Sequence, residues 1–161
     1  MRRLPLLLLP LIAACAATGR DAAPAATPRA AEPSAAELIA ARQTMMHMAA
    51  TLLYESIVPA AKNGTDVKAQ RHAADGLDLF GHSIAGLFPE GSTGPDSHAL
   101  PAIWANKADF QAKANAFGDA AARLNELATA GDTAGFAAQV PVLQRGCSGC
   151  HGLYRAELRK H

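Results

Sequence analysis

The feature that most constrains this chain is the pentapeptide Cys147-Ser148-Gly149-Cys150-His151, close to the C-terminus. On a helix, positions i, i+3 and i+4 share one face, so Cys147, Cys150 and His151 would all point at the same object. The spacing C-x-x-C-H is the attachment signature of c-type haem. The two thiols can form thioethers with the two haem vinyl groups, and the imidazole can bind the iron as the proximal axial ligand.

Two other readings of this pentapeptide are weaker. A structural zinc site needs four ligands, usually from a second Cys or His pair, and Cys15 is the one cysteine outside the motif. A thioredoxin-like C-x-x-C would lie near a βαβ pattern, and the sequence has no strand pattern. Haem attachment is therefore the favoured interpretation.

The chain begins with a predicted signal peptide, residues 1–14. Arg2 and Arg3 form its charged start, and the apolar run from Leu4 to Ile12 is too short to span a bilayer. Secretion agrees with haem attachment, which takes place outside the bacterial cytoplasm, so we expect a periplasmic protein. Loss of this segment changes the formal charge from +1 to about −1, a balance that argues against a nucleic-acid partner.

Cys15 has two interpretations. Ile12-Ala13-Ala14-Cys15 resembles a bacterial lipobox, in which the cysteine is lipidated and becomes the mature N-terminus. Ordinary cleavage after a small residue is the alternative, and it can discard Cys15 with the signal. Residues 15–33 are rich in Ala and Pro and lack apolar periodicity, so they are predicted to be a flexible tether. A tether would suit a lipid anchor through Cys15.

Residues 34–161 are long enough for one domain, and their Ala-rich composition favours helices. Ser34 and Glu37 form a capping box that starts the first helix. In the second helix, Leu77, Phe80, Ile84 and Leu87 recur at helical spacing as a predicted buried stripe. The four predicted helices run from Ser34 to about Asn63, from about Thr65 to Leu87, from about Ile103 to Ala130, and from Thr133 toward Arg159.

Two residues within these helices stand out. Pro141 removes a hydrogen bond from the fourth helix and is expected to kink or divide it. Arg42 falls within the apolar stripe of the first helix, where a buried charge would need an anion such as a haem propionate. The alternative is that Arg42 lies at the edge of the stripe and extends its charged end into water. Four helices with short or medium connections predict an antiparallel four-helix bundle around the cofactor.

Several sequence pieces, in this order and spacing, carry a family resemblance: Arg42-Gln43-x-x-Met46, Leu87-Phe88-Pro89, Ala99-Leu100-Pro101-x-Ile103-Trp104, and Cys147-x-x-Cys150-His151-x-x-Tyr154-Arg155. The chain resembles the class II c-type cytochromes, the cytochrome c-prime family, over nearly all of Ser34 to His161. The resemblance implies an all-α, antiparallel, left-handed four-helix bundle with one covalently attached haem c. It also implies a periplasmic protein that is commonly a homodimer.

The resemblance assigns further residues to the haem. Arg42 and Gln43 match positions beside the propionates, and Arg155 matches a basic residue close to the proximal imidazole. Met46 matches the sixth-ligand position of the low-spin members of the family. His98 falls in a loop that often contacts the haem edge. The sequence leaves open whether Met46 binds the iron or fills the core, as Met usually does on a helical stripe.

The function depends on whether Met46 binds the iron, and two functions are possible. With His151 and Met46 as axial ligands, the protein would be a single-electron carrier that exchanges electrons with redox partner proteins. With an open sixth position it would be a high-spin cytochrome c-prime that binds nitric oxide or carbon monoxide. No nucleophile–base constellation is evident, so an enzyme is not expected.

Overall fold

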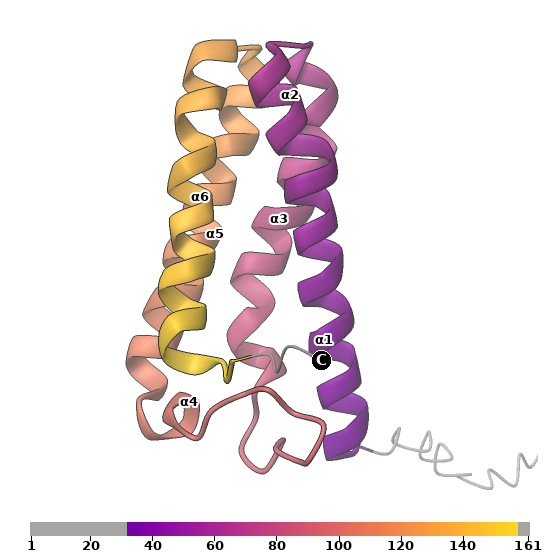
Figure 1. The fold of residues 1–161 in the computed structure, drawn as a ribbon, viewed down its shortest axis with the longest axis vertical. Coiled ribbons are helices and arrows are strands. Elements are labelled where there is room, and N and C mark those ends of the chain that lie inside the picture. Colours follow the sequence, from indigo (N-terminus) through magenta and orange to yellow (C-terminus); the bar gives the residue numbers. More distant parts are fainter. Residues whose placement is uncertain (1–31, 158–161) are drawn as a thin grey trace, which may run out of the picture. The chain divides into compact units, whose positions relative to one another are not determined.

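The computed structural model describes residues 32–157 and is all-helical over that range (Figure 1). The predicted signal peptide, Cys15 and most of the predicted tether lie outside the described residues. None of the described helices is both long and apolar enough to cross a membrane. In chain order the elements are α1 (Ala35–Thr51), η1 (Leu52–Ile57), α2 (Val58–Asn63), η2 (Val67–Gln70), α3 (Arg71–Ser83), η3 (Ile84–Leu87), α4 (Ala102–Ala105), α5 (Lys107–Ala130) and α6 (Thr133–Tyr154).

The first long helix begins at the predicted capping box. The Ser34 hydroxyl accepts a hydrogen bond from the Glu37 backbone N–H at 3.3 Å, and the Ser34 N–H donates to the Glu37 carboxylate at 2.7 Å. The helix runs on through η1, a π-helical turn, into α2, and ends at Gly64 with φ 60°. Glycine adopts this left-handed conformation without the steric penalty of a side chain. The predicted span to Asn63 is confirmed, whereas the π turn is not visible in the sequence pattern.

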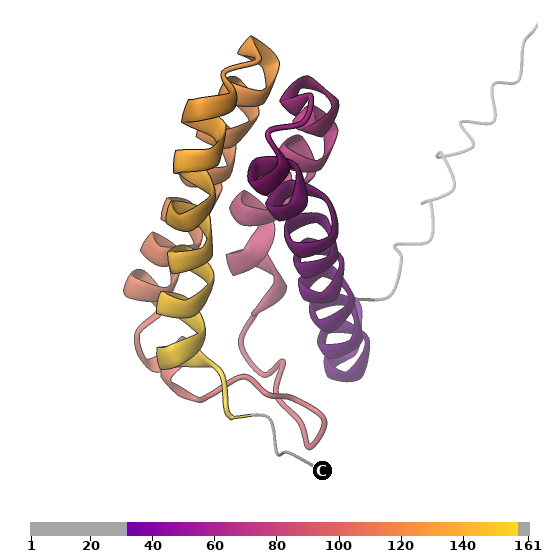
Figure 2. The same cartoon turned by 45° about the horizontal axis from the view of Figure 1, so that its top comes forward.

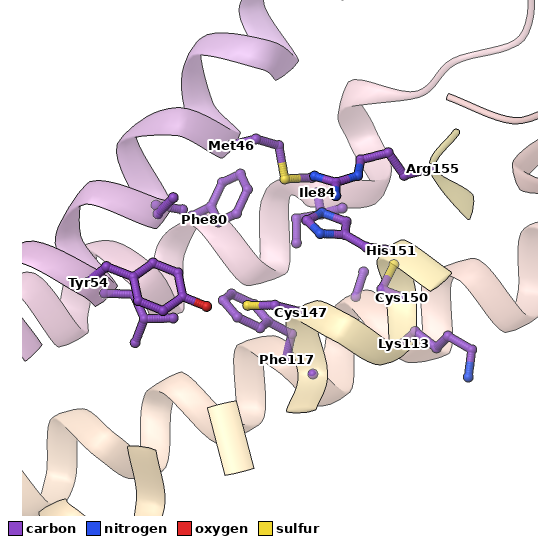
Figure 3. Close-up of a pocket in the computed structure, with 15 residues that line it drawn as sticks. Met46, Tyr54, Phe80, Ile84, Lys113, Phe117, Cys147, Cys150, His151 and Arg155 are labelled. Atoms are coloured by element: carbon purple, nitrogen blue, oxygen red, sulfur yellow. The ribbon is translucent and has the colours of Figure 1, made fainter. Parts of the chain in front are cut away.

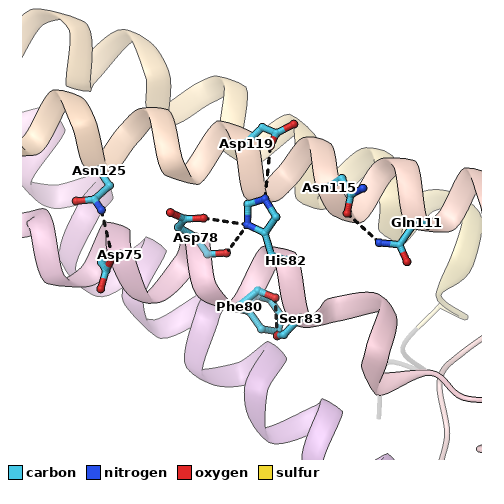
Figure 4. A network of polar contacts seen from close by, with 9 residues as sticks. All are labelled: Asp75, Asp78, Phe80, His82, Ser83, Gln111, Asn115, Asp119 and Asn125. Atoms are coloured by element: carbon cyan, nitrogen blue, oxygen red, sulfur yellow. Dashed lines mark hydrogen bonds and ion pairs between the residues drawn. The ribbon is translucent and has the colours of Figure 1, made fainter.

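The second and third long helices meet at two glycines. A Cβ atom placed on Gly81 of α3 would lie 2.5 Å from the Cα of Gly118 in α5. The two backbones can therefore approach this closely only where neither residue has a side chain. His82 spans the same contact (Figure 4), with Nδ1 2.9 Å from the Asp78 carboxylate and Nε2 3.5 Å from that of Asp119.

The fourth helix, α6, continues through Pro141, so of the two expected effects, a kink or a division, the division is wrong. Phe136, Val140 and Leu143 on its inner face are buried, while Pro141 is exposed. Burial of these neighbours stabilises the helix on both sides of the proline, which offsets the one hydrogen bond that its ring removes. The helix ends at Tyr154, earlier than the expected Arg159.

The bundle leaves a space between its first and fourth helices. α5 packs along both α3 and α6, while α6 contacts the first helix mainly through α2, at the end remote from the Cys147–His151 motif (Figures 1 and 2). A loop from Phe88 to Pro101 crosses the motif end of the bundle. It pairs with the end of α6 and the residues that follow, because the Leu100 N–H donates to the Tyr154 carbonyl at 2.9 Å and the Ala156 N–H to the His98 carbonyl at 2.8 Å.

Candidate haem site

The three residues of the C-x-x-C-H motif lie on the last turns of α6, and all three are half-buried. Cys147, Cys150 and His151 point from α6 into a pocket whose opposite wall is the first helix (Figure 3). The helical spacing of the motif therefore produces the shared face that the sequence predicts. The aromatic rings of Phe80 on α3 and Phe117 on α5, packed edge to face with centroids 6.2 Å apart, also line this pocket.

The pocket has two lobes that share five lining residues, Met46, Ala50, Cys150, His151 and Arg155. The first, which we call the apolar lobe, has a volume of about 310 Å³ and is lined mainly by aliphatic and aromatic side chains. The second, which we call the polar lobe, has a volume of about 520 Å³ and includes Arg42, Gln43, His47 and His98. Together they have the size of a cofactor site.

Met46 and His151 line both lobes from opposite walls, α1 and α6. A flat group held between the two helices would therefore have the imidazole on one face and the thioether on the other. The residues one turn after Met46 on α1 are small, since Ala49 and Ala50 line the apolar lobe. His47 is exposed and also lines the polar lobe.

Arg42 is buried, with 3% of its surface exposed. Its guanidinium donates to the Ser92 carbonyl at 2.7 Å, to the Ser92 hydroxyl at 3.1 Å and to the Ser97 hydroxyl at 2.6 Å. It also lies 4.8 Å from the centre of the Phe88 ring. Burial lowers the pKa of Arg42 from its usual value.

The position of Arg42 contradicts the sequence-based alternative in which its charged end extends into water. All three of its hydrogen bonds go to the loop. A guanidinium has five N–H donors, and three hydrogen bonds are made to the loop. The remaining donors can serve an anion in the polar lobe. Gln43 lies next to Arg42 and supports the same loop, because its Nε2 donates to the Asp96 carbonyl at 2.7 Å.

The protonation states of the motif follow from burial. Burial raises the pKa of Cys147, and it raises that of Cys150, where Lys113 acts in the opposite sense and Asp109 adds to the increase. Burial, helped by the positive charge of Arg155, lowers the pKa of His151. The imidazole is therefore held neutral at physiological pH, which is the form that binds a metal.

The pocket lining suits a large apolar group with two carboxylates. Three cationic side chains, Arg42, Lys113 and Arg155, line it, and no Asp or Glu is among the described residues that do. Within residues 32–157 no three His, Cys, Asp or Glu side chains come together as a metal site of their own. The donor set fits haem c, with thiols for its vinyl groups, an imidazole for its iron and cations for its propionates.

The pocket also includes Tyr54, Lys113 and Tyr154, to which no role was assigned from the sequence, although Tyr154 is part of the C-terminal motif that carries the family resemblance. Tyr54 reaches from η1 toward Cys147 (Figure 3), Lys113 enters from α5, and Tyr154 lines the polar lobe one turn after His151. The spacing of Tyr154 from His151 could have indicated its position. Tyr54 and Lys113 could not have been found in this way, because their positions depend on how α1 and α5 pack against α6.

A helical bundle with a C-x-x-C-H motif facing an interior pocket defines a c-type haem protein of the bundle class. The sequence profile described as "Cytochrome C'" matches residues 37–155. The chain therefore belongs to the cytochrome c′ family, whose members carry one covalently attached haem c and act in electron transfer or gas binding.

The chain is similar to individual members of this family. It is 34% identical over 91 residues to a cytochrome c′ of Pararhodospirillum photometricum, covering 56% of this chain and 72% of the relative. It is 40% identical over 94 residues to a cytochrome c-554 of Cereibacter sphaeroides, covering 56% of this chain and 70% of that relative. Its fold matches a nitric oxide complex of a cytochrome c prime variant from Alcaligenes xylosoxidans, with a TM-score of 0.72, 24% identity, and coverage of 80% of this chain and all of that one.

Proposed function

We propose that the protein is a single-electron carrier in which Cys147 and Cys150 hold haem c as thioethers and His151 and Met46 bind its iron. The haem supplies a one-electron couple at its iron when bound. The observation that carries the proposal is that Met46 and His151 line both lobes from opposite walls. A thioether ligand raises the reduction potential and keeps the sixth position filled, which suits electron transfer.

The other lining residues support this role in separate ways. The apolar side chains around Phe80 and Phe117 exclude water from the porphyrin, while Arg42 and Arg155 neutralise the propionates. Arg155 also favours the neutral form of His151 through its charge. The partners are then proteins that donate or accept electrons at the pocket opening, and the setting is the periplasm.

The second candidate function is gas binding by a five-coordinate iron. It is favoured by the small residues Ala49 and Ala50 beside Met46, which leave room next to the iron if the thioether does not bind. The fold neighbour that holds nitric oxide points in the same direction. In this case Met46 would be a packing residue, and a diatomic gas would be the physiological ligand.

Replacing Met46 by Ala separates the two functions. An electron carrier changes from a low-spin to a high-spin spectrum, while a five-coordinate protein hardly changes. Ala49→Ser is a suitable matched control, because it alters the same helix and lobe by one small atom without removing a ligand. A high-spin wild type whose spectrum is unaffected by Met46→Ala contradicts the electron-carrier proposal and supports gas binding.

We also propose that Cys15 anchors the protein to a membrane through a lipid. The proposal depends on the lipobox-like Ile12-Ala13-Ala14-Cys15 and on the Ala/Pro-rich segment after it. Metabolic labelling with palmitate should mark the wild type and should be lost in Cys15→Ser. An unlabelled wild type would contradict the anchor and leave the haem proposal unaffected.

A further inference from the structure

A cluster of three polar side chains lies beside the motif on the α5 side of the pocket. The Tyr154 hydroxyl donates to Oδ2 of Asp109, and the other carboxylate oxygen of Asp109 lies 3.8 Å from Nζ of Lys113. Tyr154 is buried, with 5% of its surface exposed, whereas the side chains of Asp109 and Lys113 are 53% and 34% exposed. The cluster therefore extends from the core, one turn after His151, to the surface.

The cluster is close enough to Cys150 to act on it electrostatically. Tyr154 follows Cys150 by four residues on α6, and both side chains line the polar lobe. Lys113 also lines the apolar lobe, and Figure 3 shows it on the Cys150 side of the pocket, away from Tyr54. A haem attached at Cys150 would thus have one negative and one positive side chain near the same edge.

A charge near a haem changes the relative stability of its two redox states. The oxidised haem carries one more positive charge than the reduced haem, so a nearby carboxylate stabilises the oxidised form and a nearby ammonium stabilises the reduced form. The hydroxyl of Tyr154 moderates the effect of the carboxylate, because a hydrogen bond donated to Asp109 offsets part of its negative charge.

We propose that Asp109, Lys113 and Tyr154 tune the reduction potential of the haem from the Cys150 edge, with Asp109 lowering it and Lys113 and Tyr154 opposing Asp109. These are positioning and tuning residues, since none of them contacts the iron. The inference rests on the proposed haem attachment at Cys150, but it holds whether or not Met46 is a ligand. A cluster that only held α5 against α6 would stabilise the fold, but its charges would not change the reduction potential.

The test is a potentiometric titration of the holoprotein and of three single variants at one pH and ionic strength. Asp109→Asn should favour the reduced form, changing the oxidised-to-reduced ratio at a given potential by roughly threefold. At 59 mV per tenfold change for a one-electron couple, this corresponds to an upward shift of about 28 mV. Lys113→Gln should shift the potential downward by a similar amount, and Tyr154→Phe should shift it downward by less.

Glu126→Gln is the matched control. It also removes one carboxylate from α5, but its position is about 25 Å further along that helix at 1.5 Å per residue, so it should leave the potential unchanged. Thermal unfolding of the same variants provides the second readout. If the cluster only holds α5 against α6, Asp109→Asn and Tyr154→Phe should both lower the stability, and Asp109→Asn and Lys113→Gln should not shift the potential in opposite directions.

Each outcome has a distinct meaning. Opposite shifts for Asp109→Asn and Lys113→Gln, both larger than that of Glu126→Gln, support the proposal. Shifts that are equal in sign, or no larger than the control, overturn it even if stability falls. A wild type without covalently bound haem, shown by mass spectrometry, overturns both this proposal and the haem attachment on which it rests.

Discussion

Replacement of the buried arginine of α1 gives the most quantitative prediction. Arg42→Met keeps much of the aliphatic volume and removes the guanidinium, which makes three hydrogen bonds to the loop and lies over the Phe88 ring. Hydrogen bonds from a charged donor contribute about 1.5–3 kcal/mol each, and a cation–π contact about 1 kcal/mol. These contributions are not additive, and removing a buried charge recovers part of its desolvation cost.

We therefore expect Arg42→Met to lower the free energy of unfolding by about 3 kcal/mol. For a domain of this size the corresponding fall in Tm is about 10 °C. Denaturant titration and thermal unfolding of the holoprotein measure the two quantities. Arg71→Met is the matched control, because Arg71 is exposed and its side chain bonds to the neighbouring His72. It should change stability by less than about 0.5 kcal/mol.

Hydrogen exchange locates the effect. Arg42 bonds to Ser92 and Ser97, whose own N–H groups donate to the carbonyls of Pro89 at 3.2 Å and Gly94 at 3.0 Å. Loss of the guanidinium should therefore speed amide exchange across residues 89–99 more than in α5. A stability loss below about 1 kcal/mol, or exchange in this loop that matches the wild type, would refute the view that Arg42 holds the loop in place.

Three further predictions concern the rest of the bundle. Gly81→Ala should destabilise the protein by about 2 kcal/mol, because its Cβ would meet the Gly118 backbone; an unchanged denaturation midpoint would show that α3 and α5 can separate freely. The backbone carbonyl and the carboxylate of Asp78 raise the pKa of His82. The stability that His82 contributes is therefore full below its unfolded-state pKa of about 6.5 and is lost as pH rises through the higher folded-state value. The stability difference between wild type and His82→Gln should accordingly be larger at pH 5.5 than at pH 8.5, and an equal difference at both would contradict this. Cys147→Ala should weaken haem retention. The haem-free protein should lose cooperative thermal unfolding, because the porphyrin fills the space between α1 and α6. A haem-free form whose calorimetric transition is unchanged would contradict this.

The parts of the structure that depend on local sequence could be predicted. The capping box at Ser34, the helix end at Gly131 with φ 73°, and the new start at Asp132 each depend on residues within one turn. The shared face of Cys147 and His151 follows from helical geometry alone. For these features the sequence is sufficient because the interacting groups are near one another along the chain.

The remaining features depend on packing between distant segments. The hydrogen bonds of Arg42 go to residues about fifty positions away, in a loop whose path has no periodic pattern. Lys113 reaches the motif only because α5 lies beside α6. Pro141 was expected to kink or divide α6, and the helix does not divide, because burial of the neighbouring apolar residues outweighs the loss of one hydrogen bond. Local propensity alone does not predict that balance.

The central claim is that His151 and Met46 bind the iron of one haem, and the optical spectrum of the purified holoprotein tests it most directly. Spectra of the oxidised and reduced protein would be recorded with and without carbon monoxide. Ligation by His151 and Met46 predicts sharp low-spin bands, a sulfur-to-iron charge-transfer band in the oxidised form, and no response to carbon monoxide. A broad high-spin spectrum that shifts when carbon monoxide is added would contradict Met46 ligation and assign the protein to gas binding.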